Sequence, residues 1–377
     1  MTTETVPPSQ DKVPSSSSKT RQATTKDVAA LAGVNPASVS VVLNGARSSA
    51  GVSEETRGRI MAAAEQLGYR RNGMAAATRT GRFGSVGLLQ AVDPNASGLP
   101  PSVLEGIHRE LELRRTHLIM HRLPLATLSN PVQLPKVLTE WSCDGLLVDM
   151  TYRIPPLMEQ AIEKSKLPAV WGNVLRECDA VRPDDYEAGR QAARHILKLG
   201  HRRICYLDLG HSWSEVQQGS VGTTAHYSAH HRYAGVRDEV QSAGAEFIVK
   251  VQDDNLDIRE RQKFERLFEK NCRHIRHVIE EQKPTAIISY DAVGFSTLVV
   301  TRDLGLKVPD DLSLLCFGPA DSWFMGHELT SMTTPEQEMG QRMVQQLFEK
   351  IEQPTLKRPH CVIPFGFYPG KTCAPPR

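Results

Sequence analysis

The side chains best suited to binding chemistry in the amino-terminal part of this chain lie on the stretch 36–43. Apolar residues at i, i+3 and i+4 give this stretch the inner face of a helix: Val39, Val42 and Leu43. Ala37, Ser38 and Val41 fall on the opposite, outward face. A hydroxyl group can hold a DNA phosphate, and a small apolar group can contact the methyl group of thymine. The outward face is therefore suited to contact with DNA.

The residues before this stretch predict the elements that position it. Thr24 and Asp27 have the spacing of a capping box, which predicts a helix that ends at Gly33. Asn35 suits an N-cap, and Pro36 suits the first position of a second helix. Two short helices joined in this way form the helix-turn-helix pattern, whose second helix enters the major groove. An ordinary helical hairpin is the alternative that these residues leave open.

A third helix is predicted over residues 52–70. Ser53 suits its N-cap, and Glu54 and Glu55 fall in the first turn, where the helix dipole favours them. Helical spacing gives this segment an inner face: Ile60, Ala64 and Leu67. Three short helices of this kind can close a small core.

The charge of the chain is unevenly distributed. Between Lys19 and Arg82 there are ten Lys and Arg but only four Asp and Glu, a net charge of +6, whereas the whole chain carries +2. The excess positive charge therefore lies with the predicted helices. A phosphate-binding surface requires positive charge there, although a merely solvated basic face is the alternative.

Several ordered motifs resemble the amino-terminal signature of the LacI (lactose-repressor and purine-repressor) family of bacterial transcription regulators. They are T-x-K-D-V-A-x-x-A-G-V at 24–34, S-V-S-x-V-L-N-G at 38–45, V-S-x-x-T-R at 52–57, Leu67-Gly68-Tyr69, and Asn72. The resemblance extends over essentially the whole chain from Thr24 onward. It implies a helix-turn-helix DNA-binding domain over 23–70, with no enzymatic activity.

The positions that the resemblance assigns to DNA binding differ from the usual family pattern. Family members often have polar side chains at the positions of Pro36 and Ala37, and Arg or His at that of Val41. We therefore expect T·A pairs opposite Ala37 and Val41, with Ser38, Ser40 and Asn44 on phosphates. The full set of expected DNA-binding residues is Thr24, Thr25, Pro36, Ala37, Ser38, Ser40, Val41, Asn44, Asn72, Ala75, Thr78 and Arg79.

Residues 71–83 resemble the family's hinge, a segment that becomes a short helix when two copies meet on the operator. A short alanine-rich helix, such as one containing Ala75, is marginal by itself in water. Thr78 replaces the usual leucine wedge, which kinks DNA from the minor groove, and Arg79 could follow that groove. A plain interdomain linker is the alternative.

Composition limits the remaining possibilities. Residues 1–22 are rich in Ser, Thr, Pro and Gln and lack an apolar run, so we expect a disordered tail and not a signal peptide. No apolar stretch approaches the roughly 18 to 20 residues of a membrane span. Seven scattered cysteines indicate reduced thiols in a bacterial cytoplasm, where the protein would associate with the nucleoid. His226, His230 and His231 lack supporting ligands, so we expect no metal and no cofactor.

Beyond Arg82 the sequence alternates between apolar runs and helical stretches. Buried strands are expected at 86–89, 118–120, 145–148, 169–170, 204–207, 247–251, 286–288 and 312–317. This alternation predicts parallel sheets covered by helices, which leaves two doubly wound lobes or one barrel as alternatives. The resemblance favours two lobes similar to periplasmic sugar-binding proteins (the type I fold), with three crossings. Within the effector-binding and dimerisation domain 84–377, lobe one would comprise 84–180 and 312–334, and lobe two 181–311 and 335–377.

The resemblance also implies an effector site between these lobes. Arg232, in HRYAGV, stands where the family has an arginine that holds the effector, and Asp291 occupies its acidic ligand position after a strand. Both side chains can hydrogen-bond to vicinal hydroxyls or to a planar base. Tyr290, Trp171 and Phe317 complete the expected set, with aromatic stacking on a ring. Two alternatives stay open: Arg232 pairs with Asp291, and Trp171 belongs to the core.

One departure affects the expected ligand. The family usually has G-[FY]-D-D near the end of the last strand of the first lobe, whereas this chain has Cys316-Phe317-Gly318-Pro319. The resemblance therefore implies a sugar-like or nucleobase-like effector, with a body used for dimerisation or for sensing a protein partner as the alternative.

The predicted function is that of a transcription regulator, most simply a repressor. A homodimer, or a tetramer built from dimers, would bind a palindromic operator in double-stranded DNA. A periplasmic solute-binding protein would need a signal peptide and would have no basic helical segment. An enzyme is disfavoured because no P-loop, nucleophile elbow or strand-associated G-x-G-x-x-G is found in the sequence.

Overall fold

The computed structural model describes residues 22–43, 51–70, 77, 81–92, 97–132, 134–140, 142–151, 154–212, 216, 226–252, 264–319 and 323–377. The chain divides into two compact units, Met1–Gly81 and Arg82–Arg377, which we call the head and the body. None of the described helices is both long and apolar enough to span a membrane.

The head contains the three predicted helices, α1 (Thr25–Ala32), α2 (Pro36–Leu43) and α3 (Glu54–Gln66). The capping box before α1 forms, because the Asp27 amide donates to Thr24 Oγ1 at 3.3 Å and the Thr24 amide donates to Asp27 Oδ2 at 2.7 Å. The helices close a small core of Val28, Ala29, Ala32, Val39, Val42, Ile60, Ala63 and Ala64. Leu67, expected in this core, is 37% exposed because α3 ends just before it.

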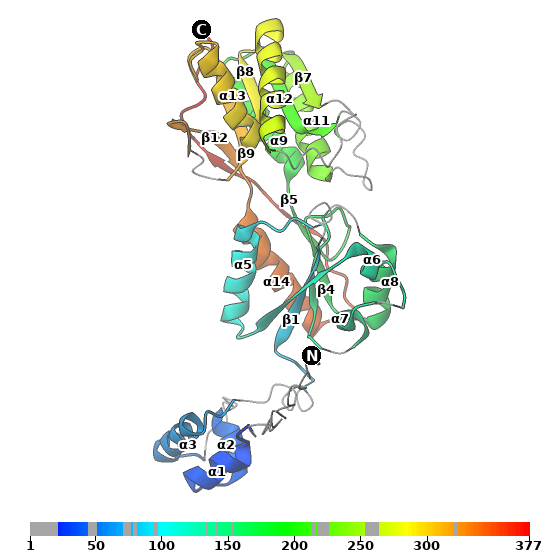
Figure 1. Cartoon of the computed structure of the whole chain (residues 1–377), viewed down its shortest axis with the longest axis vertical. Coiled ribbons are helices and arrows are strands. Elements are labelled where there is room, and N and C mark those ends of the chain that lie inside the picture. Colours follow the sequence, from blue (N-terminus) through cyan, green and yellow to red (C-terminus); the bar gives the residue numbers. More distant parts are fainter. Residues whose placement is uncertain are drawn as a thin grey trace, which may run out of the picture. The chain divides into compact units, whose positions relative to one another are not determined.

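The first sheet of the body is entirely parallel, with the strand order β13-β5-β4-β3-β1-β2. Its strands are β1 (Ser85–Ala91), β2 (His117–Leu123), β3 (Leu146–Asp149), β4 (Ala169–Gly172), β5 (Ala180–Pro183) and β13 (Cys361–Ile363). One face is covered by α5 (Pro101–Leu113) and α14 (Glu336–Glu352), and the other by α6 (Leu125–Leu128), α7 (Lys136–Thr139) and α8 (Pro156–Ser165) (Figure 1). We call this layered unit lobe one.

The second sheet has the order β14-β12-β9-β8-β6-β7, and only its β12–β14 pair is antiparallel. Its strands are β6 (Arg203–Ser212), β7 (Glu246–Gln252), β8 (Ala286–Tyr290), β9 (Ser313–Gly318), β12 (Thr330–Thr333) and β14 (Gly366–Tyr368). The covering helices are α9 (Asp185–Lys198) and α11 (Tyr227–Ser242) on one face, and α12 (Phe264–His277), the π-helix Val278–Gln282 and α13 (Asp291–Asp303) on the other. A short hairpin, β10 (Trp323–Phe324) and β11 (His327–Glu328), accompanies this lobe two.

The expected two-lobe architecture with three crossings is confirmed, and the barrel alternative is excluded by the two open sheets. The expected lobe boundaries are wrong. Segment 312–334 contributes β9 and β12 to lobe two, whereas α14 and β13, within 335–377, belong to lobe one. The chain crosses between lobes after β5, before α14 and after β13. Cys316–Pro319 therefore ends a strand of lobe two, not of lobe one.

Strand β2 corrects a second expectation, since the run Leu118–Met120 is not buried. It lies at the edge of the sheet with β1 as its one neighbouring strand, and Ile119 and Met120 are 39% and 47% exposed. Short strands β5, β12, β13 and β14 were not predicted. Three or four residues are too few for a periodic pattern to become visible.

Candidate functional site

The outward surface of α2 is small and uncharged in the structure. Pro36 and Ala37 are exposed, and Ser38, Ser40 and Val41 are half-buried. Asn35 Oδ1 accepts the Ala37 amide at 2.8 Å, so the side chain predicted as the N-cap satisfies the start of α2. These residues of α2, which were expected to contact DNA, therefore lie together on or beside one accessible face. No bidentate hydrogen bond to a base is available from Pro36, Ala37 or Val41.

The other expected DNA-binding residues are divided between two groups. Thr24 is exposed and Thr25 is half-buried, at the start of α1. Asn44, Asn72, Ala75, Thr78 and Arg79 lie outside the described residues, as does nearly all of the expected tail.

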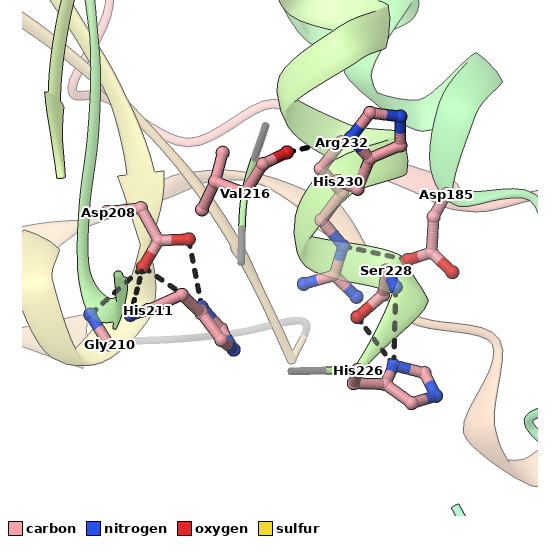
Figure 2. Close-up of polar contacts among 9 residues, drawn as sticks. All are labelled: Asp185, Asp208, Gly210, His211, Val216, His226, Ser228, His230 and Arg232. Atoms are coloured by element: carbon pink, nitrogen blue, oxygen red, sulfur yellow. Dashed lines mark hydrogen bonds and ion pairs between the residues drawn. The ribbon is translucent and has the colours of Figure 1, made fainter. Parts of the chain in front are cut away.

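In the body, Arg232 of α11 is held by a carboxylate that the sequence analysis did not single out. Its Nε donates to Asp185 Oδ1 at 2.8 Å, and the side chains of Arg232 and Asp185 are only 12% and 1% exposed (Figure 2). Burial by itself lowers the pKa of Arg232, but the charge of Asp185 and the hydrogen bond to it raise this pKa above its ordinary value. Arg232 is therefore a fixed, neutralised cation.

Three aromatic rings surround the same guanidinium group. The Arg232 Cζ atom lies 5.1 Å from the ring centroid of Tyr290, 5.2 Å from that of Phe317 and 5.3 Å from that of Phe365. Cation–π contacts of this kind stabilise a buried guanidinium group. The structure thus brings Tyr290 and Phe317 to Arg232, as expected, and adds Phe365.

Asp291 lies apart from this ion pair. It is the first residue of α13, and its Oδ1 accepts the Ala292 amide at 2.8 Å. A Cβ atom added at Gly318 would come within 2.8 Å of Asp291 Cβ, so the glycine allows β9 to approach the start of α13. The alternative in which Arg232 pairs with Asp291 is wrong, because the partner is Asp185.

Trp171 packs in the core of lobe one, where it also lines a cavity together with Glu159 and Arg176. It is 3% exposed on β4, in the cluster that includes Met158 and Ile162. The guanidinium group of Arg176 covers its ring at 4.6 Å from the centroid and is ion-paired with Glu159. The ring that was expected to stack on an effector is therefore covered by Arg176, and its contact with an effector stays a prediction.

A second carboxylate, Asp208, lies within β6 near this site. Asp208 is fully buried and accepts the amides of Gly210 and His211 at 2.9 and 3.2 Å (Figure 2). Nδ1 of His211 lies 2.9 Å from Asp208 Oδ2. A single carboxylate thus fixes the irregular last part of β6, between Asp208 and Ser212.

Two of the three histidines considered as metal ligands, His226 and His230, make separate hydrogen bonds. His226 Nε2 donates to the carbonyl oxygen of Asn173 at 2.8 Å, and its Nδ1 lies 2.7 Å from Ser228 Oγ. Burial lowers the pKa of His226 to about 4, so its ring is neutral at pH 7. His230 Nδ1 lies 2.7 Å from the Val216 carbonyl oxygen.

Asn173 also connects the two lobes directly. It follows β4 of lobe one with a left-handed backbone (φ 56°), and its Oδ1 accepts the hydroxyl of Tyr227 at 2.9 Å. Tyr227 and His226 begin α11, the helix that carries Arg232. A change in the angle between the lobes therefore acts on the helix of the candidate effector site.

Comparisons with protein families agree with this two-part organisation. Residues 24–72 match the family described as bacterial regulatory proteins, lacI family. Residues 193–373 match the periplasmic binding protein-like domain.

Similar proteins extend over most of the chain. The HTH-type transcriptional repressor PurR of Mannheimia succiniciproducens is 25% identical over 348 residues, which cover 89% of this chain and 94% of that protein. PurR of Escherichia coli is 26% identical over 336 residues, covering 87% and 90%. Among solved structures, the lac repressor dimer bound to operator and the anti-inducer ONPF has a TM-score of 0.70 at 19% identity, covering 94% of this chain and all of that one. The CelR–cellobiose complex has a TM-score of 0.57 at 23% identity, covering 93% and 100%.

A helix-turn-helix head followed by a two-lobed α/β body defines a class of protein, the DNA-binding transcription regulators with a periplasmic-binding-protein-like domain. Within this class the chain carries the DNA-binding domain of the LacI family at 24–72, so the resemblance seen in its sequence is confirmed. The relatives that extend over most of the chain are named as transcriptional repressors.

Proposed function

We propose that this protein represses transcription as a homodimer on a palindromic operator, and that a small molecule bound near Arg232 changes its affinity for DNA. The observation that carries the proposal is the joining of a LacI-family head to a body whose α11 bears Arg232 and contacts both lobes. Closure or opening of the lobes would shift a two-state equilibrium of the residues that connect head and body. The protein would act in the bacterial cytoplasm, on the nucleoid.

We assign base contacts to Ala37 and Val41 and phosphate contacts to Ser38 and Ser40, because these residues lie on or beside the accessible face of α2. Selection of bound fragments from random double-stranded DNA by the full chain tests this assignment. We expect a palindrome with half-sites about one helical turn apart. Failure to bind any duplex in low salt would refute the proposal.

A matched pair of variants makes the experiment specific. Ala37→Asp places a carboxylate on the exposed face of α2 and should abolish selective binding. Ala62→Asp makes the same change on an exposed position of α3 and should leave the affinity within about threefold. Sedimentation at micromolar concentration tests the proposed homodimer, since a strictly monomeric protein could not occupy both half-sites.

A second candidate function is regulation without a sugar effector, with a body used for dimerisation or for a protein partner. Two features favour it: Cys316–Pro319 lacks the usual carboxylates, and Arg232 already has a partner in Asp185. Operator binding measured with and without a panel of sugars and nucleobases separates the two functions. A change in affinity with any of these compounds supports the first.

A further inference from the structure

Lobe one contains a cavity of about 760 Å³ that is separate from the Arg232 site. All of its lining residues lie within 159–179 and 350–357, segments that belong to elements of lobe one or connect them. Arg232 and Asp185 lie instead on α11 and α9 of lobe two. Small-molecule sites typically have volumes of about 300–1,000 Å³. The size of this cavity therefore fits a small molecule, and the proposed effector site does not include it.

The cavity lies toward the amino-terminal ends of the strands of this sheet. Leu167 and Pro168, which precede β4, and Asp179, which precedes β5, are among its lining residues. Asn173, which contacts Tyr227 of lobe two, follows β4 at its carboxyl end. Because β1, β3, β4 and β5 are parallel, their amino-terminal ends share one edge of the sheet. The cavity is therefore at the edge where β1 begins, and Asn173 lies at the opposite edge.

The first residue of the body is fixed beside this cavity. Arg82 Nη2 donates to the carbonyl oxygen of Ile351, in the last turn of α14, at 3.0 Å. Lys350, the residue before Ile351, lines the cavity, and so do Pro354 and Thr355 just after the helix. The same turn of α14 thus forms part of the cavity wall and holds the residue at which the body begins. A molecule that displaces this turn also acts on Arg82.

The charged groups around the cavity balance one another. Lys350 Nζ lies 2.7 Å from Asp179 Oδ2, and the two side chains are only 8% and 18% exposed. Arg176 is paired in the same way with Glu159. The remaining charged lining residues are two carboxylates and two ammonium groups: Glu163, Glu177, Lys166 and Lys357. An anion such as phosphate, or a simple cation, therefore meets no net attraction in the cavity.

The buried part of the lining is apolar and aromatic. Ile162, Ala169 and Trp171 are at most 6% exposed. Cζ of Arg176 lies 4.6 Å from the centroid of the Trp171 ring, and both groups line the cavity. A guanidinium group is planar and stacks on aromatic rings, and the charge of this one is already neutralised by Glu159. An aromatic ring without a net charge is therefore the ligand that fits this lining.

We propose that this cavity binds an uncharged aromatic molecule of one or two rings, and that its occupancy changes the affinity of the head for DNA. The inference goes beyond the effector site near Arg232, because it assigns a second site on lobe one. Only the effect on DNA rests on the proposed function. A ring bound against Lys350 shifts the last turn of α14, and the hydrogen bond to Arg82 passes this shift to the residues that connect body and head.

The first test uses indole as the probe and the full chain as the protein. Calorimetric titration should detect binding of indole with a dissociation constant of about 1 mM or lower. Cys178→Phe places a large side chain in the cavity lining and should weaken this binding at least about tenfold. Thr355→Trp, at an exposed lining position, is a second blocking variant that does not depend on the packing around Cys178. Leu175→Phe is the matched control, because Leu175 is an exposed neighbour that does not line the cavity.

Two charged relatives of indole test the ligand class. Indole-3-acetate and tryptamine carry the same ring with a negative and a positive charge, and neither should bind more tightly than indole. Binding of either at least about tenfold more tightly than indole would contradict the uncharged class. Circular dichroism melts establish that each variant is folded. The proposal is overturned if the wild type binds indole no more tightly than the folded blocking variants do.

The effect on DNA is measured separately. Saturating indole should change the affinity of the wild type for its selected operator at least about threefold, and should change that of Arg82→Met by less than about 1.5-fold. An equal response of the two proteins would show that the effect does not pass through Arg82, and would overturn the proposed coupling. A protein that binds no duplex refutes the proposed function, whereas calorimetry with indole still decides whether the cavity is a binding site.

Discussion

Gly189 of α9 and Gly235 of α11 lie against each other's helix backbone. A Cβ atom at Gly189 would come within 2.4 Å of the Arg232 carbonyl oxygen, and one at Gly235 within 2.1 Å of the Tyr186 carbonyl oxygen. This close crossing sets the distance between the two helices and so brings Asp185 to Arg232. Lobe one repeats the arrangement, because Gly106 of α5 and Gly340 of α14 make equivalent approaches.

The first prediction follows from this crossing. Gly235→Ala should destabilise the body by about 1–3 kcal/mol, because the added methyl group forces two packed helices apart. Urea unfolding measures the loss. Gly58→Ala in α3 is the comparison, since nothing lies within 4 Å of the added atom and alanine favours a helix. An unchanged body stability for Gly235→Ala would mean that the helices separate freely.

The second prediction concerns the capping box of the head. Thr24→Ala removes the side-chain oxygen that accepts the Asp27 amide, and should lower the stability of the head by about 1 kcal/mol. A thermal melt of the chain followed by helical circular dichroism measures it. Thr24→Ser retains the hydroxyl and should behave as the wild type. Equal losses for alanine and serine would show that the methyl group, and not the cap, is what matters.

The third prediction concerns the stability of the folded protein at acidic pH. The pKa of His226 is about 4 in the folded protein and about 6.5 when unfolded, so between these values only the unfolded chain takes up the proton. The contribution of His226 to the free energy of unfolding is therefore fully present above about pH 6.5. It is lost, by up to about 3 kcal/mol, as the pH approaches 4.

Urea unfolding across this pH range measures the effect of His226. Burial also lowers the pKa values of His201 and His231, which contribute in the same direction. His226→Asn, which retains a capping side chain, isolates the contribution of one ring and should show a shallower decline. If its decline equals that of the wild type, His226 does not titrate as described.

The fourth prediction concerns base recognition by α2. Replacing thymine by uracil opposite Ala37 or Val41 in a selected half-site should weaken binding by about 1 kcal/mol per position, because a methyl contact is lost. Fluorescence anisotropy measures the affinity. The same replacement outside the half-sites should have no effect. A full-strength complex with uracil at both contacted positions would refute the assignment.

Local patterns in the sequence predicted local structure well. Helical spacing placed Val39 and Val42 inside the head, and all eight apolar runs expected as strands became strands. The same patterns do not encode which sheet a strand joins. The run 312–317 is as apolar as any strand of lobe one, yet β9 pairs with β8 and β12 in lobe two. Register and strand order depend on contacts between distant segments, which one sequence does not reveal.

The candidate site was predicted only in part for the same reason. Arg232, Tyr290 and Phe317 come together as the family resemblance implied, but the ion-pair partner of Arg232 lies 47 residues earlier in the chain. One signal was available: two consecutive aspartates begin α9, and a helix needs only one N-cap. Asp185, the second of these aspartates, is not needed as the N-cap and is available to pair with Arg232.

The return of α14 to lobe one has a consequence for synthesis on the ribosome. This helix supplies Met339, Met343, Val344 and Leu347 to the core that also contains Val103 and Ile107 of α5. Every residue of lobe two between Asp184 and Thr334 must be translated before α14 emerges. A nascent chain therefore leaves part of this apolar core uncovered until translation is nearly complete, and exposed apolar surface of this kind favours aggregation.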